Sequence, residues 1–296
     1  MKFIDENGND KRIGENGRFV MLDNGMRLSY CEFGEENEEV IVTAGVYFHT
    51  FIPFMKELAK KYHVYGVVLR IGDDCEVPEY NTQFDADGSV NWARQWGEDV
   101  YQFARAIELE KFHYVGKCHG ALPGWYLQRE HPDTLLSLTN IGITLHAFER
   151  LSNRWWELQK EETDKFMLRT LKKHHLLGIK GQEAMTVGFT PGVSTAGVPG
   201  MNALEVIGYN PEVVFDSLDE VKEQMKTIEI PVLQILGTDD PLYWDYKNSN
   251  DYAVDNMRGA RSVILQGERH LSEMDMPKLL AREVVFFLEG TKLPFE

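Results

Sequence analysis

Residues 113–132 read HYVGKCHGALPGWYLQREHP, and they contain the strongest structural signal in the chain. A short run typical of a β-strand leads through Gly-Lys-Cys-His-Gly into a sequence that favours a helix. Gly116 and Gly120 lie two residues before and two residues after Cys118. A turn this tight leaves no room for side chains at those two positions, and glycine removes the clash. Cys118 is therefore predicted at the crest of the turn, where the dipole of the following helix favours a thiolate. The alternative interpretation is a small apolar residue in a glycine-rich turn.

Strand-like and helix-like segments alternate on both sides of this turn. The sequence predicts an opening hairpin from 18–22 and 26–34, joined by a turn at Asp23-Asn24-Gly25. Further strands are predicted at 39–45, 64–70, 112–116, 135–142, 230–237 and 261–267, and helices at 51–62, 91–109, 121–132 and 278–290. This alternation indicates an α/β protein with a mostly parallel central sheet flanked by helices.

The alternation stops between the two halves of the chain. From about residue 143 to residue 228 the sequence is largely helical and rich in aromatic residues, with a Gly- and Pro-containing loop at 188–202. We therefore expect residues 1–142 and 229–296 to form one core. Residues 143–228 are expected to form a helical cap or lid inserted over one edge of the sheet.

Composition narrows the possible functions and locations. The chain has 296 residues, 43% of them hydrophobic, which is enough for one substantial core. A net charge of −16 disfavours binding to nucleic acid or to anionic membranes. Three cysteines form no disulfide framework, the amino terminus lacks a signal-peptide pattern, and the apolar runs are too short to span a bilayer. The sequence predicts a cytoplasmic protein that acts on a small molecule, with a homodimer as a possible assembly.

Two further residues lie in loops that follow predicted strands. In parallel α/β sheets such loops, at the carboxyl ends of the strands, bind ligands. Asp240 follows the strand at 230–237 in the segment LGTDDPLY, with Asp239 as the competing carboxylate. His270 follows the last predicted strand and is the only histidine after Asp240. A nucleophile, an acid and a histidine base in this chain order match the order of the α/β-hydrolase triad.

Several segments resemble the α/β-hydrolase superfamily, in its branch of capped small-molecule hydrolases. NGMRLSYCEFG resembles the opening strand pair of that branch, GEDVYQFARAIELEKFHYVGKCHG its helix and nucleophile turn, and IPVLQILGTDD its acid strand. The resemblance extends over residues 18–292 apart from the cap. It implies that Cys118 is the nucleophile, that His270 is the general base and acid, and that Asp240 orients the imidazole. Most members have serine at the turn, whereas a cysteine is similar to dienelactone hydrolases, which are shorter and lack such a cap.

The resemblance also implies an oxyanion hole made of backbone amides. The family usually shows His-Gly after the first central strand, whereas this chain has Ala44-Gly45. Because backbone N–H groups stabilise an oxyanion without help from an imidazole, the hole does not require that histidine. The donors implied by the resemblance are the amides of Val46 and His119.

Candidate substrate-binding residues lie after the predicted oxyanion loop, at the end of a central strand and in the cap. For the two tryptophans of the cap, Trp155 and Trp156, the alternative to binding substrate is packing of the cap on the core. For Arg70 the alternative is a structural ion pair. The candidates are Tyr47, His49, Arg70, Trp155 and Trp156.

The remaining cysteines and histidines give no further site. Cys31 and Cys75 lack the glycine pattern and are expected to be structural. His174 and His175 are adjacent, so on a helix their side chains would point about 100° apart, which disfavours a shared metal. The sequence implies no metal and no cofactor.

The function indicated is that of a cysteine-dependent hydrolase acting on a small carbonyl compound, with an ester or a lactone favoured and a thioester or C–C bond possible. Three alternatives stay open. One is a C–C lyase or acyltransferase that uses the same triad, and another is a non-catalytic ligand-binding protein on the hydrolase fold. The third is that Cys118 is an engineered replacement for serine.

Overall fold

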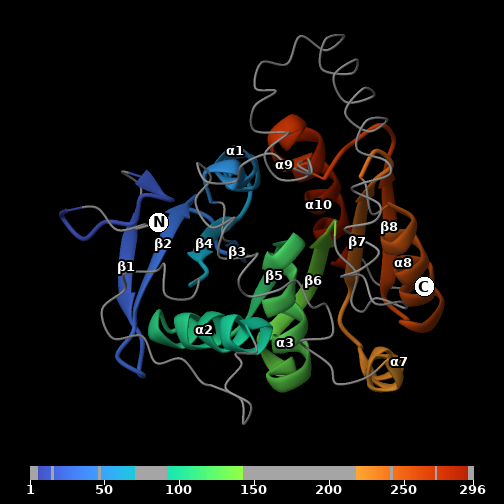
Figure 1. Ribbon diagram of the computed structural model, residues 1–296, viewed down its shortest axis with the longest axis horizontal. Helices are drawn as coiled ribbons and strands as arrows, with labels where there is room; N and C mark the ends of the chain where they lie inside the picture. The colour runs from blue at the N-terminus through green and yellow to red at the C-terminus, as the bar shows by residue number, and fades with distance from the viewer. Residues whose placement is uncertain are drawn as a thin grey trace, which may run out of the picture.

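A computed structural model describes residues 6–14, 17–45, 48–70, 92–142, 218–240, 243–270 and 272–292. Within these ranges eight strands form one sheet in the order β1-β2-β4-β3-β5-β6-β7-β8, with β1 and β8 at its two edges (Figure 1). The strands are β1 Arg18–Met21, β2 Arg27–Phe33, β3 Val40–Gly45, β4 His63–Val68, β5 Phe112–Lys117, β6 Leu135–Ile141, β7 Val232–Gly237 and β8 Ala260–Leu265.

The predicted opening hairpin is confirmed. β1 pairs antiparallel with β2, and β2 pairs antiparallel with β4, whereas every other neighbouring pair in this sheet is parallel. In the hairpin turn Gly25 has a φ of 83°, a conformation that glycine adopts without strain. Asn24 Oδ1 accepts a hydrogen bond of 2.9 Å from the Met26 amide, which fixes the turn.

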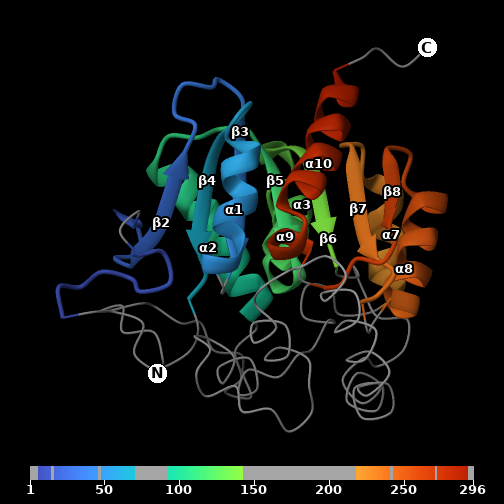
Figure 2. The same cartoon turned by 90° about the horizontal axis from the view of Figure 1, so that it is seen from above.

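Helices cover both faces of the sheet. In Figure 2, α1, α9 and α10 lie in front of the sheet, with α2 and α3 behind it. The helices are α1 Phe48–Leu58, α2 Trp92–Ala106, α3 Leu122–Glu130, α7 Leu218–Thr227, α8 Tyr243–Asn256, α9 Ser272–Asp275 and α10 Pro277–Thr291. The mostly parallel α/β architecture predicted from the sequence is therefore confirmed.

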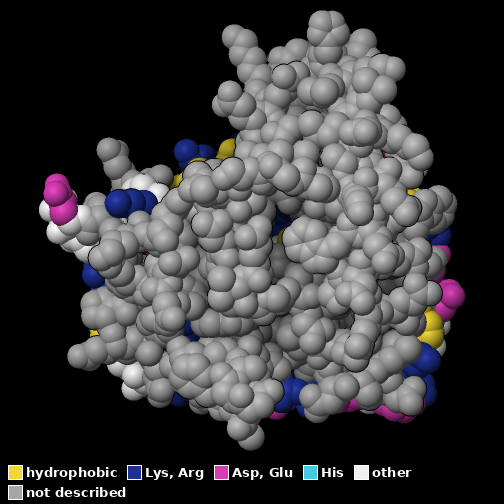
Figure 3. All heavy atoms as spheres, viewed as in Figure 1, with side chains coloured by type: hydrophobic (Ala, Val, Ile, Leu, Met, Phe, Trp, Pro, Cys, Tyr) yellow, Lys and Arg dark blue, Asp and Glu magenta, His cyan; other side chains and the backbone are white. Residues whose placement is uncertain are grey.

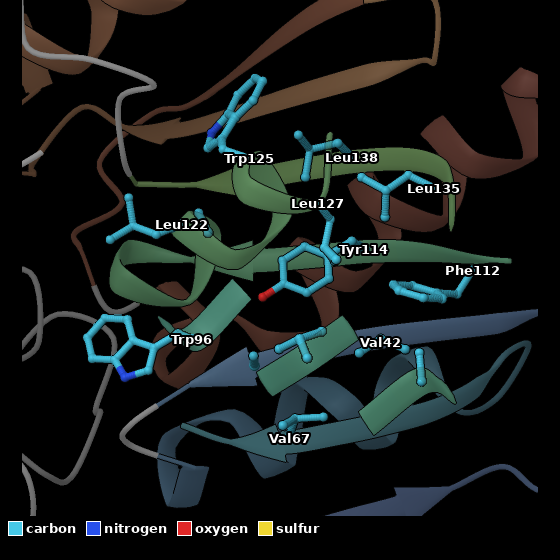
Figure 4. Packing of buried hydrophobic residues seen from close by; sticks show 14 of the residues in the cluster. Val42, Val67, Trp96, Phe112, Tyr114, Leu122, Trp125, Leu127, Leu135 and Leu138 are labelled. Atoms are coloured by element: carbon cyan, nitrogen blue, oxygen red, sulfur yellow. The ribbon is translucent and has the colours of Figure 1, made fainter. Parts of the chain in front are cut away.

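The core is divided by the sheet, because successive residues of a strand point to opposite faces. In β5, Tyr114 joins the cluster that contains Trp96 and Trp125 from α2 and α3 (Figure 4). Its neighbour Val115 joins the cluster on the other face, with residues of α1 and α10. Strands buried on both faces are typical of parallel sheets, and they explain why the central strands are apolar runs.

The predicted cap lies outside the described residues except for residues 218–228. In this part of the chain Val221 and Met225 of α7, and Ile228 after it, are buried in the same cluster as Trp96. The boundaries of the cap remain a prediction. α7 lies in the block that the sequence predicts to be largely helical, although its bounds were not predicted, whereas α8 and α9 were not predicted.

The described surface mixes charges of both signs. Lys, Arg, Asp and Glu side chains are interspersed along the rim of the space-filling view (Figure 3). Among the helices that the structure describes, none combines the length and the apolar character needed to cross a membrane.

Candidate active site

The turn after β5 has the predicted strand-to-helix geometry. β5 ends at Lys117, a single 3₁₀ turn spans Cys118–Ala121, and α3 begins at Leu122. Cys118 is half-buried and has a φ of 49°, in the left-handed region that non-glycine residues rarely occupy. Such strain persists only where the surrounding structure imposes it, and it is concentrated at functional sites.

The two glycines of the turn are required by close backbone contacts. A Cβ on Gly116 would lie 2.4 Å from both Ala121 Cα and the Gly120 carbonyl oxygen. A Cβ on Gly120 would lie 1.9 Å from the Ala44 carbonyl oxygen. The clash that the sequence predicts at both positions is therefore present, and the end of β3 lies directly against the turn at Cys118–Ala121.

We expect Gly120→Ala to lower the free energy of unfolding by about 3 kcal/mol, because backbone must move to accept the new methyl group. Gly290→Ala in α10 is the matched control, since a Cβ there would meet only the tip of Arg261 at 3.5 Å. A helical Gly→Ala change is neutral or stabilising by up to about 1 kcal/mol. Denaturant unfolding of both variants measures the difference. Equal stability of the two would contradict the packing described for the turn.

His270 and Asp240 are brought together from two separate loops. Asp240 follows β7, where its amide donates to the Gly237 carbonyl in a tight turn, and His270 follows β8. His270 Nδ1 lies 2.6 Å from Asp240 Oδ2, and both side chains are almost fully buried. The competing carboxylate, Asp239, is partly exposed, and its amide donates to the Glu268 carbonyl. The carboxylate that contacts the histidine is thus that of Asp240.

The surroundings of His270 favour its protonated form. Burial is the largest single effect and lowers the pKa of the imidazole, but the charge and hydrogen bond of Asp240, together with the charge of Cys118, outweigh it and raise that pKa to about 9. Lys117 acts against this shift, and a thiolate at Cys118 adds to it. All three residues of the predicted triad therefore interact at the same end of the sheet.

Two glycines that the sequence analysis did not single out make room for this pair. Gly142 directly follows β6 and has a φ of 58°, and a Cβ there would lie 3.3 Å from His270 Nδ1. A Cβ on Gly237, at the end of β7, would lie 2.2 Å from the Glu268 carbonyl oxygen. The sequence does contain a signal for these two positions, namely a glycine at or just after the end of a buried strand. Such a glycine marks a place where another backbone or side chain approaches closely.

The proposed oxyanion hole is described only in part. His119 belongs to the 3₁₀ turn at Cys118–Ala121, whereas Val46 lies outside the described residues. The Gly120 contact with Ala44 places the chain that leads to Val46 beside the turn. Both oxyanion donors remain predictions.

The other predicted substrate-binding residues fall mostly outside the described part. Tyr47, Trp155 and Trp156 are not described, and for His49 only the backbone, in the first turn of α1, is described. Their roles remain predictions.

Arg70 is engaged in an ion pair. Its Nε and Nη2 each donate to a carboxylate oxygen of Asp99 at 2.6 Å, and both side chains are buried. Burial raises the pKa of Asp99 to about 6, although Arg70 opposes the shift. Trp96 Nε1 also donates to the Arg70 carbonyl at 2.5 Å. The structure therefore contains an ion pair at this arginine, which joins α2 to the segment that follows β4. A contact of Arg70 with substrate remains a prediction.

Cys31 differs from Cys118 in its environment. It is fully buried in β2, and burial raises the pKa of its thiol to about 12. Such a thiol is inert, in keeping with the structural role expected for it. Cys75 lies outside the described residues.

No metal centre is found in the described ranges, where no group of three or more His, Cys, Asp or Glu side chains could hold an ion. His174 and His175 lie outside those ranges. The described residues at this end of the sheet include a thiol, an imidazole and a carboxylate.

The sheet order, the strand-to-helix turn and the positions of Asp240 and His270 define the α/β-hydrolase fold. Solved structures of this fold are similar to the chain over nearly its whole length. A meta-cleavage product hydrolase from Pseudomonas fluorescens has a TM-score of 0.68 at 17% identity, with 94% of this chain and 99% of that chain covered. A membrane phospholipase A described as a bacterial virulence factor has a TM-score of 0.63 at 18% identity, covering 96% and 89%. The enol-lactonase from Burkholderia xenovorans has a TM-score of 0.59 at 16% identity, covering 92% and 100%.

At these identities the likeness shows the fold alone. No family model matches the sequence, and no curated protein matches it. The function therefore has to be argued from the residues of the site.

Proposed function

We propose that the protein is a hydrolase of small carbonyl compounds that uses Cys118 as its nucleophile, His270 as its acid and base, and Asp240 to orient His270. The observation that carries this proposal is the strained Cys118 at the turn, whose charge acts on the imidazole of a buried His270–Asp240 pair. An imidazole held by a carboxylate is the partner that a catalytic nucleophile requires.

The raised pKa of His270 suggests how the first step proceeds. At neutral pH the imidazole holds a proton, which we take to come from Cys118, so the resting site is a thiolate–imidazolium pair. The thiolate attacks the carbonyl carbon, and the amides of Val46 and His119 stabilise the oxyanion. When the oxyanion collapses, the bond to the leaving group breaks, and His270 gives that group its proton. The product of this step is a thioester on Cys118.

Deacylation needs the opposite role from His270. Once Cys118 is acylated its negative charge is gone, which removes one of the charges that raise the pKa of the imidazole. Neutral His270 then takes a proton from water, and the hydroxide formed attacks the thioester carbonyl. The acid product leaves, and the thiolate–imidazolium pair is restored.

The substrate class is proposed to be an ester or a lactone. A cysteine at the turn favours this class through its resemblance to dienelactone hydrolases, and a lactonase is among the proteins of similar fold. A C–C bond remains the second choice, since a meta-cleavage product hydrolase also shares the fold. The cap proposed at 143–228 would exclude bulk water and shape the pocket. A cytoplasmic location and a homodimer remain predictions.

The test is a panel of small esters, lactones, thioesters and β-diketones, assayed for turnover and quenched for intact mass spectrometry. We expect turnover of an ester or lactone, with the mass of its acyl group on the peptide that carries Cys118. Cys118→Ala is the control and should show neither. Turnover without an adduct at Cys118, or with equal rate in Cys118→Ala, would contradict the proposal. A product formed with an added alcohol or amine would instead favour an acyltransferase.

A further inference from the structure

A buried ion pair joins β5, just before the turn at Cys118–Ala121, to the segment around His270, which we call the histidine loop. Lys117 Nζ lies 3.0 Å from Glu273 Oε1, and the side chains are 4% and 1% exposed. Lys117 is the last residue of β5 and directly precedes Cys118. Glu273 belongs to α9, which begins two residues after His270. The pair thus connects the two segments that carry the proposed nucleophile and base.

General stability is a weak explanation for this pair. Removing two charges from water is costly, and replacing a buried ion pair with apolar residues of similar size is often neutral or stabilising. The histidine loop is also held by other contacts, because the Glu268 carbonyl accepts from the Asp239 amide and Arg269 pairs with Asp275 at 2.5 Å. Because the Arg269–Asp275 pair already holds this loop, the buried Lys117–Glu273 pair calls for a role in the site itself.

We propose that Lys117 is a positioning residue that places a fixed positive charge beside the Cys118–His270 pair, and that Glu273 holds and moderates that charge. This inference rests on the proposed function of Cys118. A nearby positive charge favours a thiolate over a thiol and a neutral imidazole over an imidazolium. Lys117 would therefore promote formation of the nucleophile and keep His270 from retaining its proton too strongly.

The other charges at this end of the sheet are consistent with such a role. Lys117 lowers the pKa of His270, against the opposing effects of Asp240 and Cys118. Arg269 and Asp275 are engaged with each other through two contacts, at 2.7 and 2.5 Å. Lys117 and Glu273 are thus the charged pair whose balance can be altered without touching a residue assigned to the reaction.

The test is the pH profile of Cys118 alkylation by iodoacetamide, measured by intact mass and peptide mapping, which needs no substrate. Lys117→Met leaves the charge of Glu273 unbalanced, so the acid limb of the profile should move up by about 1 pH unit. Glu273→Gln leaves the charge of Lys117 unbalanced, so the acid limb should move down by a similar amount. Lys117→Arg keeps the charge and should restore the wild-type profile. A purely structural clamp would slow both single variants without moving their profiles in opposite directions.

The double variant Lys117→Met/Glu273→Met is the control for folding, because it leaves neither charge of the pair buried without its partner. Its acid limb should move up, by less than in Lys117→Met. Profiles that coincide with wild type in the folded variants would overturn the inference while leaving the reactive Cys118 intact. If Cys118 is unreactive in the wild-type protein, the proposed function fails, and this inference fails with it.

Discussion

Cys118→Ala is expected to lower kcat/KM at least about 10⁴-fold on any substrate that the wild-type protein turns over. The change removes the only atom of the triad that can form the covalent intermediate. The fold should persist, because alanine fits the turn and is no larger than cysteine. We therefore expect the melting temperature to stay close to that of the wild type while turnover disappears. Activity is measured with the substrate found in the ester and lactone panel.

Two further variants make this result specific. Cys31→Ala is the matched control, because Cys31 lies in β2, away from the proposed site, and should leave kcat/KM unchanged. Cys118→Ser keeps a nucleophile but lacks a thiolate, and a serine needs a neutral imidazole to remove its proton. In this variant the pKa of His270 should lie below about 9, because the thiolate charge that helps to raise it is gone, while Asp240 still raises it. The serine variant should therefore be slower than the wild type at pH 7 and gain activity as the pH rises through this lowered pKa. A serine variant as fast as the wild type at pH 7 would contradict the thiolate–imidazolium account.

Asp240→Asn is expected to lower kcat about 10⁴-fold and to change how stability depends on pH. The native pKa of His270, about 9, is raised above its ordinary value of 6.5. Protonated His270 therefore stabilises the folded state fully below about pH 6.5, and this contribution is lost as the pH rises through 9. The difference between the two pKa values corresponds to about 3 kcal/mol. The asparagine variant should lack most of this contribution.

Guanidinium unfolding at pH 6 and pH 9.5 measures the effect. The comparison is made in a Cys118→Ala background, because in the wild type the proton that His270 gains is the one that Cys118 loses, and the two contributions offset each other. In that background the parent should lose more stability between these two pH values than its Asp240→Asn derivative, by up to about 3 kcal/mol. Asp239→Asn is the matched control, since Asp239 is partly exposed and should leave both activity and this pH dependence unchanged. A parallel pH dependence in Cys118→Ala and Cys118→Ala/Asp240→Asn would show that Asp240 does not set the charge of His270.

Much of the core could be predicted from the sequence because its signals are local. β5, the turn and α3 are encoded by one continuous stretch, and the buried parallel strands are apolar runs. α8, in contrast, is strongly polar, so the helical spacing of its apolar residues is weak. It also follows soon after the loop that carries Asp240. The order of the strands in the sheet could not be predicted from any single strand, because it depends on how the chain crosses between parallel strands.

The site could be predicted only where a residue type is rare. His270 stood out as the last histidine, whereas the choice between Asp239 and Asp240 depends on the geometry of one turn. The contact of Arg70 with Asp99 joins residues 29 positions apart, so it could not be predicted from a local pattern. The Lys117–Glu273 pair joins residues 156 positions apart, and no local pattern predicts such a contact.

Brief iodoacetamide treatment followed by intact mass spectrometry shows whether Cys118 is an activated nucleophile. Samples across pH 5 to 9 would be compared for the wild type, Cys118→Ala and His270→Ala. The account predicts rapid, single alkylation at Cys118 near pH 7, no such product in Cys118→Ala, and slower alkylation in His270→Ala. Cys31 should stay unmodified, because burial raises the pKa of its thiol to about 12. A Cys118 that reacts no faster than Cys31 or Cys75 would contradict the account and favour a ligand-binding protein on the hydrolase fold.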